Sequence, residues 1–237
     1  MAAASVPHLP PASADPVVLL TRPQAASDRF AAMLPQGMRA LIAPLMTIAP
    51  VAFDPALLDA ARGLVFTSEH AVAMAGAGRG RPALCVGPRT AAAARARGFA
   101  VTEGPGDALR LEPLIRAAGP GLVHPHGRHV ARVLPVPGVV VYDQIAQPLD
   151  AAARALLDDS AARVIVTLFS PRSARLLAQA VGQMRANPVV VSISAAADAQ
   201  WPGPARQRVI AQSPDAAAMC RAVTAVWQAE RTTSQAG

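Results

Sequence analysis

Short runs of consecutive apolar residues alternate with helical patterns along most of the chain. Such runs predict strands that are buried on both faces, as in a parallel sheet covered by helices. The expected strands are residues 17–20, 39–44, 64–66, 83–86, 121–123, 138–145, 163–169, 188–193 and 209–211. The expected helices are residues 24–34, 54–61, 69–75, 91–97, 108–117, 148–159, a segment ending near 181, and 215–231. The alternation predicts an α/β fold.

Small polar residues stand where several of these strands end and the next helix begins. Hydroxyl groups and free backbone N–H groups collect at such turns, and anions bind there. A hydroxyl at such a turn also serves as an ordinary helix N-cap, so each turn alone allows both interpretations. The hydroxyl-bearing residues are Thr21, Thr67, Ser68, Thr90, Ser170, Ser173 and Ser194.

The segment VFTSEHAV at 65–72 resembles the segment LFSPRSAR at 168–175. Each is followed by a further strand, turn and helix, CVGPRTAAAA in one case and VSISAAADA in the other. The offset of roughly 100 residues is too long for a solenoid repeat and indicates two similar domains. The alternative is that all α/β units share this pattern.

The chain has 237 residues, of which 52% are apolar and only 3% aromatic. The net charge of +7 comes mainly from scattered arginines, with no block of like charges, so a nucleic-acid tail is not expected. The net charge suits either a solvated surface or the binding of a small, highly anionic ligand.

No apolar run is long enough for a membrane span. The composition of residues 1–14 predicts a disordered tail rather than a signal peptide. Cys85 and Cys220 lie in apolar settings and predict reduced core residues of a cytoplasmic protein.

No established catalytic or nucleotide-binding motif is present. The chain lacks a glycine-rich dinucleotide fingerprint, a P-loop and a serine nucleophile elbow. His124, His126 and His129 suggest zinc, but no acid or cysteine completes a ligand set in the sequence, so turn or pocket-lining roles are favoured over a metal site. Gly127 and Arg128, expected at a strand-to-helix turn, are better candidates for contact with an anion.

Several segments, in this order and spacing, resemble the uroporphyrinogen-III synthase family over about residues 17–229. They are LLTRP at 19–23, VFTSEHAV at 65–72, VGPRTAAAARARGF at 86–99, VVVYDQ at 139–144 and LFSPRSA at 168–174. The resemblance implies two flavodoxin-like, three-layer α/β domains with parallel sheets, joined by a two-stranded linker, with the active site in the interdomain cleft. It places domain 1 at residues 15–44 and 147–237, the inserted domain 2 at 47–140, and the linker at 45–46 and 141–146.

The family's reaction cyclises hydroxymethylbilane, a linear tetrapyrrole with eight carboxylates, to uroporphyrinogen III. Water is lost, and the last ring is inverted through a spiro intermediate. The resemblance implies that no cofactor or metal is needed and that the enzyme acts mainly by positioning the substrate. Tyr142, the only tyrosine, is the expected catalytic acid or hydrogen-bond donor, with linker packing as the alternative. The expected substrate-binding residues are Thr21, Arg22, Thr67, Ser68, Gly87, Arg89, Thr90, Arg128, Ser170, Pro171, Ser173 and Ser194.

The sequence departs from the family pattern in two places. The turn at 194–197 lacks the threonine that many members carry, and His126-Gly127-Arg128 stands where many members have Arg-Gly, which places the charge on Arg128. The expected partner is the tetrapyrrole substrate, handed over transiently by hydroxymethylbilane synthase. We expect a monomer that binds neither nucleic acid nor membrane. Two rival hypotheses are a non-catalytic two-domain binder of a small polyanion, and a different α/β enzyme that acts on a nucleotide or sugar phosphate.

Overall fold

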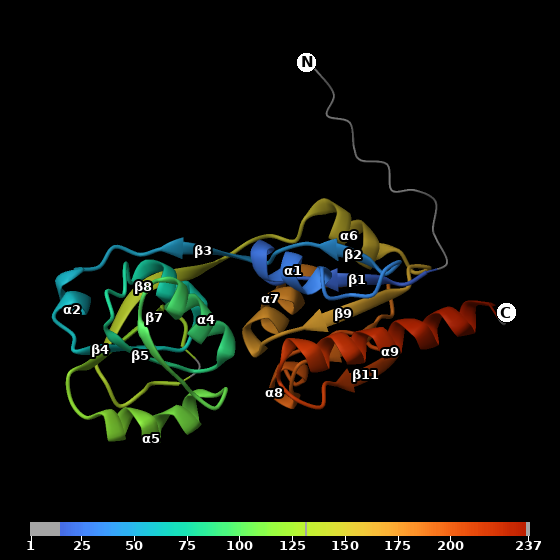
Figure 1. Ribbon diagram of the computed structural model, residues 1–237. Coiled ribbons are helices and arrows are strands. Elements are labelled where there is room, and N and C mark those ends of the chain that lie inside the picture. Colours follow the sequence, from blue (N-terminus) through green and yellow to red (C-terminus); the bar gives the residue numbers. More distant parts are fainter. Residues whose placement is uncertain (1–14, 131, 236–237) are drawn as a thin grey trace, which may run out of the picture. The chain divides into compact units, whose positions relative to one another are not determined.

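The computed structural model describes residues 15–130 and 132–235, and the expected tail at 1–14 lies outside this part of the chain. The chain divides into two compact units (Figure 1). Unit 1 combines the residues up to Thr47 with those from Ala146 onward, and unit 2 is Ile48–Ile145. The chain therefore passes between the units twice, once after Thr47 and once after Ile145. No helix in the described residues has the length and apolar character that a membrane span requires.

Unit 1 contains a parallel sheet in the order β11-β10-β9-β1-β2. Numbered within the unit, this is the 2-1-3-4-5 order of flavodoxin-like folds. Its strands are β1 (Val17–Leu20), β2 (Arg39–Ile42), β9 (Val164–Leu168), β10 (Val189–Ser192) and β11 (Gln207–Ile210). Its helices are α1 (Gln24–Ala31), α6 (Ala151–Asp158), α7 (Pro171–Val181), α8 (Ala195–Asp198) and α9 (Ala216–Gln235).

Alternate residues of the unit 1 strands enter two separate cores, one on each face of the sheet. Leu19 and Val166 pack with apolar residues of α6, α7 and α8, while Val18 and Ile165 pack with those of α1 and α9. Because successive side chains of a strand point to opposite faces, an unbroken apolar run fills both cores. Unit 1 is thus a three-layer α/β structure.

Unit 2 contains six strands in the order β3-β8-β7-β4-β5-β6. They are β3 (Met46–Pro50), β4 (Gly63–Phe66), β5 (Pro82–Cys85), β6 (Ala100–Glu103), β7 (Leu122–Gly127) and β8 (Gly138–Ala146). The helices are α2 (Ala56–Asp59), α3 (Glu69–Met74), α4 (Pro88–Ala96) and α5 (Ala108–Ala118). Leu64 and Phe66 pack with α2, α3 and α4, whereas Val65 packs with α5, so this sheet also separates two cores.

The two sheets are circular permutants of one another. If unit 2 is numbered from β7, the order β8-β7-β4-β5-β6 becomes 2-1-3-4-5, the same as in unit 1. In this numbering β4 corresponds to β9 and β5 to β10. These are the strands of the two similar sequence segments, so the topology supports the repeat hypothesis.

Strand β3 is the additional strand of unit 2 and extends the sheet beside β8. Two backbone hydrogen bonds fix its direction: Gln147 N–H donates to the Leu45 carbonyl (2.8 Å), and Val51 N–H donates to the Val141 carbonyl (3.1 Å). Residue numbers rise on one strand as they fall on the other, which is an antiparallel arrangement. The chain at residues 46–50 is therefore part of this sheet.

Several expectations about individual elements are wrong. Strand β7 continues through Pro125 to Gly127, and the next element is β8, so Arg128 does not lie at a strand-to-helix turn. Strand β6 is absent from the expected elements. Helix α9 begins one residue later than expected, after Asp215, whose Oδ1 accepts a hydrogen bond from Ala218 N–H (2.8 Å). Cys85 is buried, but Cys220 is only partly buried and its thiol donates to the Met33 carbonyl.

Candidate functional site

Each unit has one edge at which all its parallel strands end. In a flavodoxin-like sheet, ligands bind at this carboxyl edge, beside the point where the strand order reverses. That point lies between β1 and β9 in unit 1, and between β7 and β4 in unit 2. The predicted hydroxyl-bearing residues follow the strands at both points.

Tyr142 is the central polar side chain at the carboxyl edge of unit 2. It lies on β8, opposite Gly127 at the end of β7. A Cβ atom on Gly127 would lie 2.5 Å from Cζ of Tyr142, so only glycine leaves room for the ring. The phenol thereby reaches over β7 and forms a hydrogen bond with the Ser68 side chain. The structure thus brings together two predicted site residues that are far apart in sequence.

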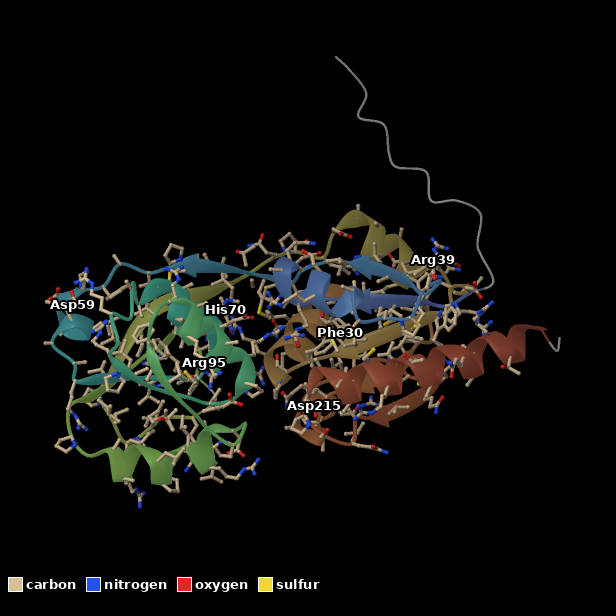
Figure 2. All side chains as sticks on the ribbon, in the orientation of Figure 1. Phe30, Arg39, Asp59, His70, Arg95 and Asp215 are labelled. Atoms are coloured by element: carbon tan, nitrogen blue, oxygen red, sulfur yellow. The ribbon has the colours of Figure 1, made fainter. Side chains whose placement is uncertain are left out.

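Burial raises the pKa of Tyr142 above its usual value, and the Ser68 hydrogen bond opposes this only in part. The phenol therefore stays protonated at neutral pH and can donate a hydrogen bond. Ser68 is the N-cap of α3 and accepts a hydrogen bond from His70 N–H (3.2 Å). The His70 ring packs edge-on against Tyr142, with ring centroids 5.7 Å apart (Figure 2 labels His70).

His124 fixes the neighbouring turn. Its Nε2 atom lies 3.0 Å from Oγ1 of Thr67, a hydrogen bond that joins β7 to the end of β4. Burial, with the nearby His126 as a smaller cause, lowers the pKa of His124 to about 4. The imidazole is therefore neutral at neutral pH. The structure gives His124 a positioning role for Thr67, in line with the expected turn or pocket-lining role.

The three other predicted residues near β5 lie at the start of α4. Gly87 is the N-cap, and its position would bring a Cβ atom within 3.3 Å of Gly106 Cα. Arg89 is exposed, with its Nε 3.7 Å from a carboxylate oxygen of Glu69, and Thr90 is 5% exposed in the first helical turn. Gly87 and Thr90 are thus both buried, and Arg89 is the exposed residue of the three.

Arg128 follows β7 and is engaged within the protein. Its Nε donates to Asp143 Oδ2 (3.0 Å), and its N–H donates to the Tyr142 carbonyl (2.9 Å). Its charge is therefore partly compensated by the adjacent strand, which weakens the expectation that it contacts an anion. His129 also lies beside Asp143, with Nε2 3.5 Å from Oδ1. No group of three potential metal ligands occurs among the described residues.

The carboxyl edge of unit 1 combines a cation with a buried hydroxyl. The guanidinium of Arg22 lies 4.3 Å from the ring centroid of Phe169, so it spans the β1–β9 boundary. Thr21 is 1% exposed, and its hydroxyl has no hydrogen-bond partner among the described residues. A buried hydroxyl without a partner costs roughly 1–3 kcal/mol.

The serines of unit 1 are helix caps. Ser170 and Ser173 form a capping box at the start of α7, in which Ser170 Oγ accepts from Ser173 N–H (3.0 Å) and Pro171 occupies the first helical position. Ser194 caps α8, with its Oγ accepting from Ala197 N–H (3.3 Å). These contacts satisfy backbone N–H groups at the start of each helix.

Sequence reasoning missed three contributors: His70, Phe169 and the contact between Tyr142 and Ser68. His70 lies two residues after Ser68, and Phe169 directly follows β9. The position of an aromatic or imidazole residue next to a hydroxyl-bearing turn is the sequence signal that could have identified His70 and Phe169.

The fold defines an α/β protein with parallel sheets. Comparison with protein families then identifies the family. The family described as uroporphyrinogen-III synthase HemD matches residues 29–221, and the chain belongs to this family.

Solved structures agree on the fold. The chain resembles uroporphyrinogen-III synthetase from Helicobacter pylori at a TM-score of 0.60 and 15% identity, covering 90% of this chain and 99% of that one. A mutant uroporphyrinogen III synthase from the extremely thermophilic bacterium Thermus thermophilus matches with a TM-score of 0.53, 15% identity and the same coverage. A search of curated protein sequences gave no significant match.

Proposed function

We propose that the chain is a uroporphyrinogen-III synthase that cyclises hydroxymethylbilane to uroporphyrinogen III. The observation that carries this proposal is the family match across residues 29–221, which indicates a function in tetrapyrrole biosynthesis. The reaction removes water and inverts the last ring through a spiro intermediate, which makes the enzyme a lyase. We further expect a cytoplasmic monomer that receives its substrate from hydroxymethylbilane synthase.

The substrate carries eight carboxylates, and the two carboxyl edges supply donors for them. In our proposal the carboxyl edges of both units take part in substrate binding. Unit 1 contributes Arg22, the Thr21 hydroxyl and the helix ends capped by Ser170 and Ser194. Charge-assisted hydrogen bonds to carboxylates are about twice as strong as neutral ones, so Arg22 is the leading contact.

Tyr142 assists the departure of the hydroxyl group. Its phenol either transfers a proton to the leaving oxygen, which then departs as water, or donates a hydrogen bond to it. In the second case the oxygen departs as hydroxide and becomes water with the proton that the substrate releases at ring closure. If the proton is transferred, the phenolate takes up the proton that the substrate releases when the new ring closes. The raised pKa of Tyr142 supports this role because the phenol arrives at the reaction protonated.

Ring inversion itself requires positioning. Free hydroxymethylbilane closes directly to isomer I, so the enzyme must hold the chain in the geometry of the spiro intermediate for the faster formation of isomer III. Well-oriented reactants gain several kcal/mol relative to free ones, without any reactive cofactor.

The isomer composition of the product tests the proposal. The protein is mixed with freshly prepared hydroxymethylbilane, the products are oxidised, and isomers I and III are separated by chromatography. Isomer III in excess, formed faster than the uncatalysed closure, is the expected result. Isomer I alone, formed at the uncatalysed rate, would reject the proposed enzyme activity. The hypothesis of a non-catalytic polyanion binder would then remain. Thermal stabilisation by nucleotides but not by uroporphyrinogen would favour the hypothesis of an α/β enzyme that acts on nucleotides.

A further inference from the structure

Unit 2 contains a hollow that lies away from its carboxyl edge. It has a volume of about 580 Å³, within the range of small-molecule sites. It is lined by the α2 region, the last residues of α3 and the loop 76–81 before β5. Since β4 begins at Gly63 and β5 at Pro82, this hollow lies toward the amino ends of the strands. Figure 2 shows Asp59 and His70 at opposite ends of the unit.

The walls of this hollow are apolar on one side and cationic on the other. Phe53, Leu58 and Met74 provide apolar surface. Arg81 donates to the Leu58 carbonyl (2.6 Å) and lies 4.0 Å from Asp59, so its charge is partly compensated. Arg79 is exposed, and its guanidinium has no hydrogen bond or ion pair with any residue that the structure describes. A small molecule in the hollow therefore meets one cation that is not already paired.

The backbone holds Arg79 in an uncommon conformation. Its φ of 50° makes it the only non-glycine residue with positive φ in the described chain, and Gly80 beside it also has positive φ. Such a conformation costs about 1 kcal/mol or more for a residue with a side chain, and strained positions of this kind cluster at functional sites. The loop is fixed on its other side, where Gly78 N–H donates to the Arg97 carbonyl (2.6 Å) and Gly80 N–H donates to the Gly98 carbonyl (2.7 Å).

We infer that this hollow binds a small amphipathic carboxylate, with its apolar body on Phe53, Leu58 and Met74 and its carboxylate on Arg79. The inference does not depend on the proposed reaction. The hollow shares α3 with the carboxyl edge, because Met74 and Ala75 line the hollow at one end of the helix and Ser68 caps the other end.

Methyl NMR of the full-length chain tests the inference, with 2-naphthoate as the probe and methionines labelled at their methyl groups. The Met74 resonance, assigned from Met74→Leu, should shift and saturate. Arg79→Gln should weaken the apparent affinity about tenfold, the usual loss for a hydrogen bond to a charged group. The matched control is Arg97→Gln, which removes an exposed arginine of the same unit outside the hollow and should leave the affinity unchanged.

Two further variants sharpen the result. Ala75→Leu places extra volume in the hollow and should abolish the Met74 shift, while Tyr142→Phe should preserve it. Equal affinities of Arg79→Gln and Arg97→Gln would overturn the inference, as would a saturating shift confined to methionines outside the hollow or no saturating shift at all. If Ala75→Leu does not fold, the arginine pair decides the question alone.

Discussion

The carboxyl edges of the two units occupy the same topological position but differ in chemistry. In unit 2 the polar side chains bond to one another: Thr67 to His124, and Ser68 to Tyr142. In unit 1 the corresponding position holds Arg22 stacked on Phe169 and the buried Thr21 hydroxyl, which lacks a partner among the described residues. The strand order therefore determines where a site forms, and the residues at each strand end determine its role. We expect unit 2 to supply the reacting group and unit 1 to supply carboxylate binding.

Removal of the Tyr142 hydroxyl should have the largest effect on turnover, because we expect unit 2 to supply the reacting group. For Tyr142→Phe we expect kcat to fall by about 10²-fold or more, because a positioned acid typically contributes about 10²–10⁴-fold. Turnover to isomer III measures the loss, and thermal unfolding shows whether the variant folds. Ser68→Ala is the companion variant, since it keeps the phenol but removes its partner, and its loss should be smaller. Unchanged turnover in Tyr142→Phe would reduce Tyr142 to a packing residue.

Acid titration tests whether the polar network of unit 2 is held by a neutral His124. The unfolded state takes up a proton as the pH falls through about 6.5, whereas the folded state takes it up only near a pKa of about 4. The unfolded state binds more protons in this window, so the free energy of unfolding should decrease from about pH 6.5 to about pH 4, by about 3 kcal/mol.

His124→Gln removes the titrating group and retains an amide near the Nε2 position. Its free energy of unfolding should lack this part of the pH dependence in denaturant titrations. If the free energy of unfolding depended on pH with the same slope in the wild type and in His124→Gln, His124 would not be held neutral in the folded state.

The sequence pattern was sufficient for the alternation of elements and for most strand ends, because both follow from local hydrophobicity and turn chemistry. It could not place Tyr142 beside Ser68. That contact depends on a register shift between His126 and Gly127, which puts Tyr142 rather than Val141 opposite Gly127. Register depends on long-range pairing that no local pattern encodes.

Two local misinterpretations have similar causes. Strand β6 lies at the edge of its sheet and is mostly exposed, so it lacks the unbroken apolar run of the inner strands. The expectation of an anion contact at Arg128 depends on a helix after β7. The next element is instead β8, which pairs in parallel with β7. Asp143 on β8 accepts a hydrogen bond at Oδ2 from Arg128 Nε (3.0 Å).

The role assigned to unit 1 predicts a change in substrate affinity. For Arg22→Gln we expect KM to rise about tenfold with kcat nearly unchanged, because a charged hydrogen bond contributes roughly 1.5–3 kcal/mol. Steady-state kinetics with hydroxymethylbilane measures both constants. Arg39→Gln is the control, since Arg39 begins β2 at the opposite edge of the same sheet (Figure 2). An equal rise in KM for both variants would indicate a general charge effect.

Ser194 should give the smallest effect and separates capping from ligand contact. Ser194→Ala removes the hydrogen bond that Ser194 Oγ accepts from Ala197 N–H, and should lower the free energy of unfolding by about 1 kcal/mol or less, because α8 has only four residues. Aspartate is also a good N-cap, so Ser194→Asp should restore stability. Its negative charge should nevertheless raise KM several-fold if a substrate carboxylate binds at this helix end. Wild-type stability together with wild-type KM in Ser194→Asp would leave Ser194 as a cap alone, and carboxylate binding in unit 1 would then depend on the β1–β9 boundary at Thr21 and Arg22.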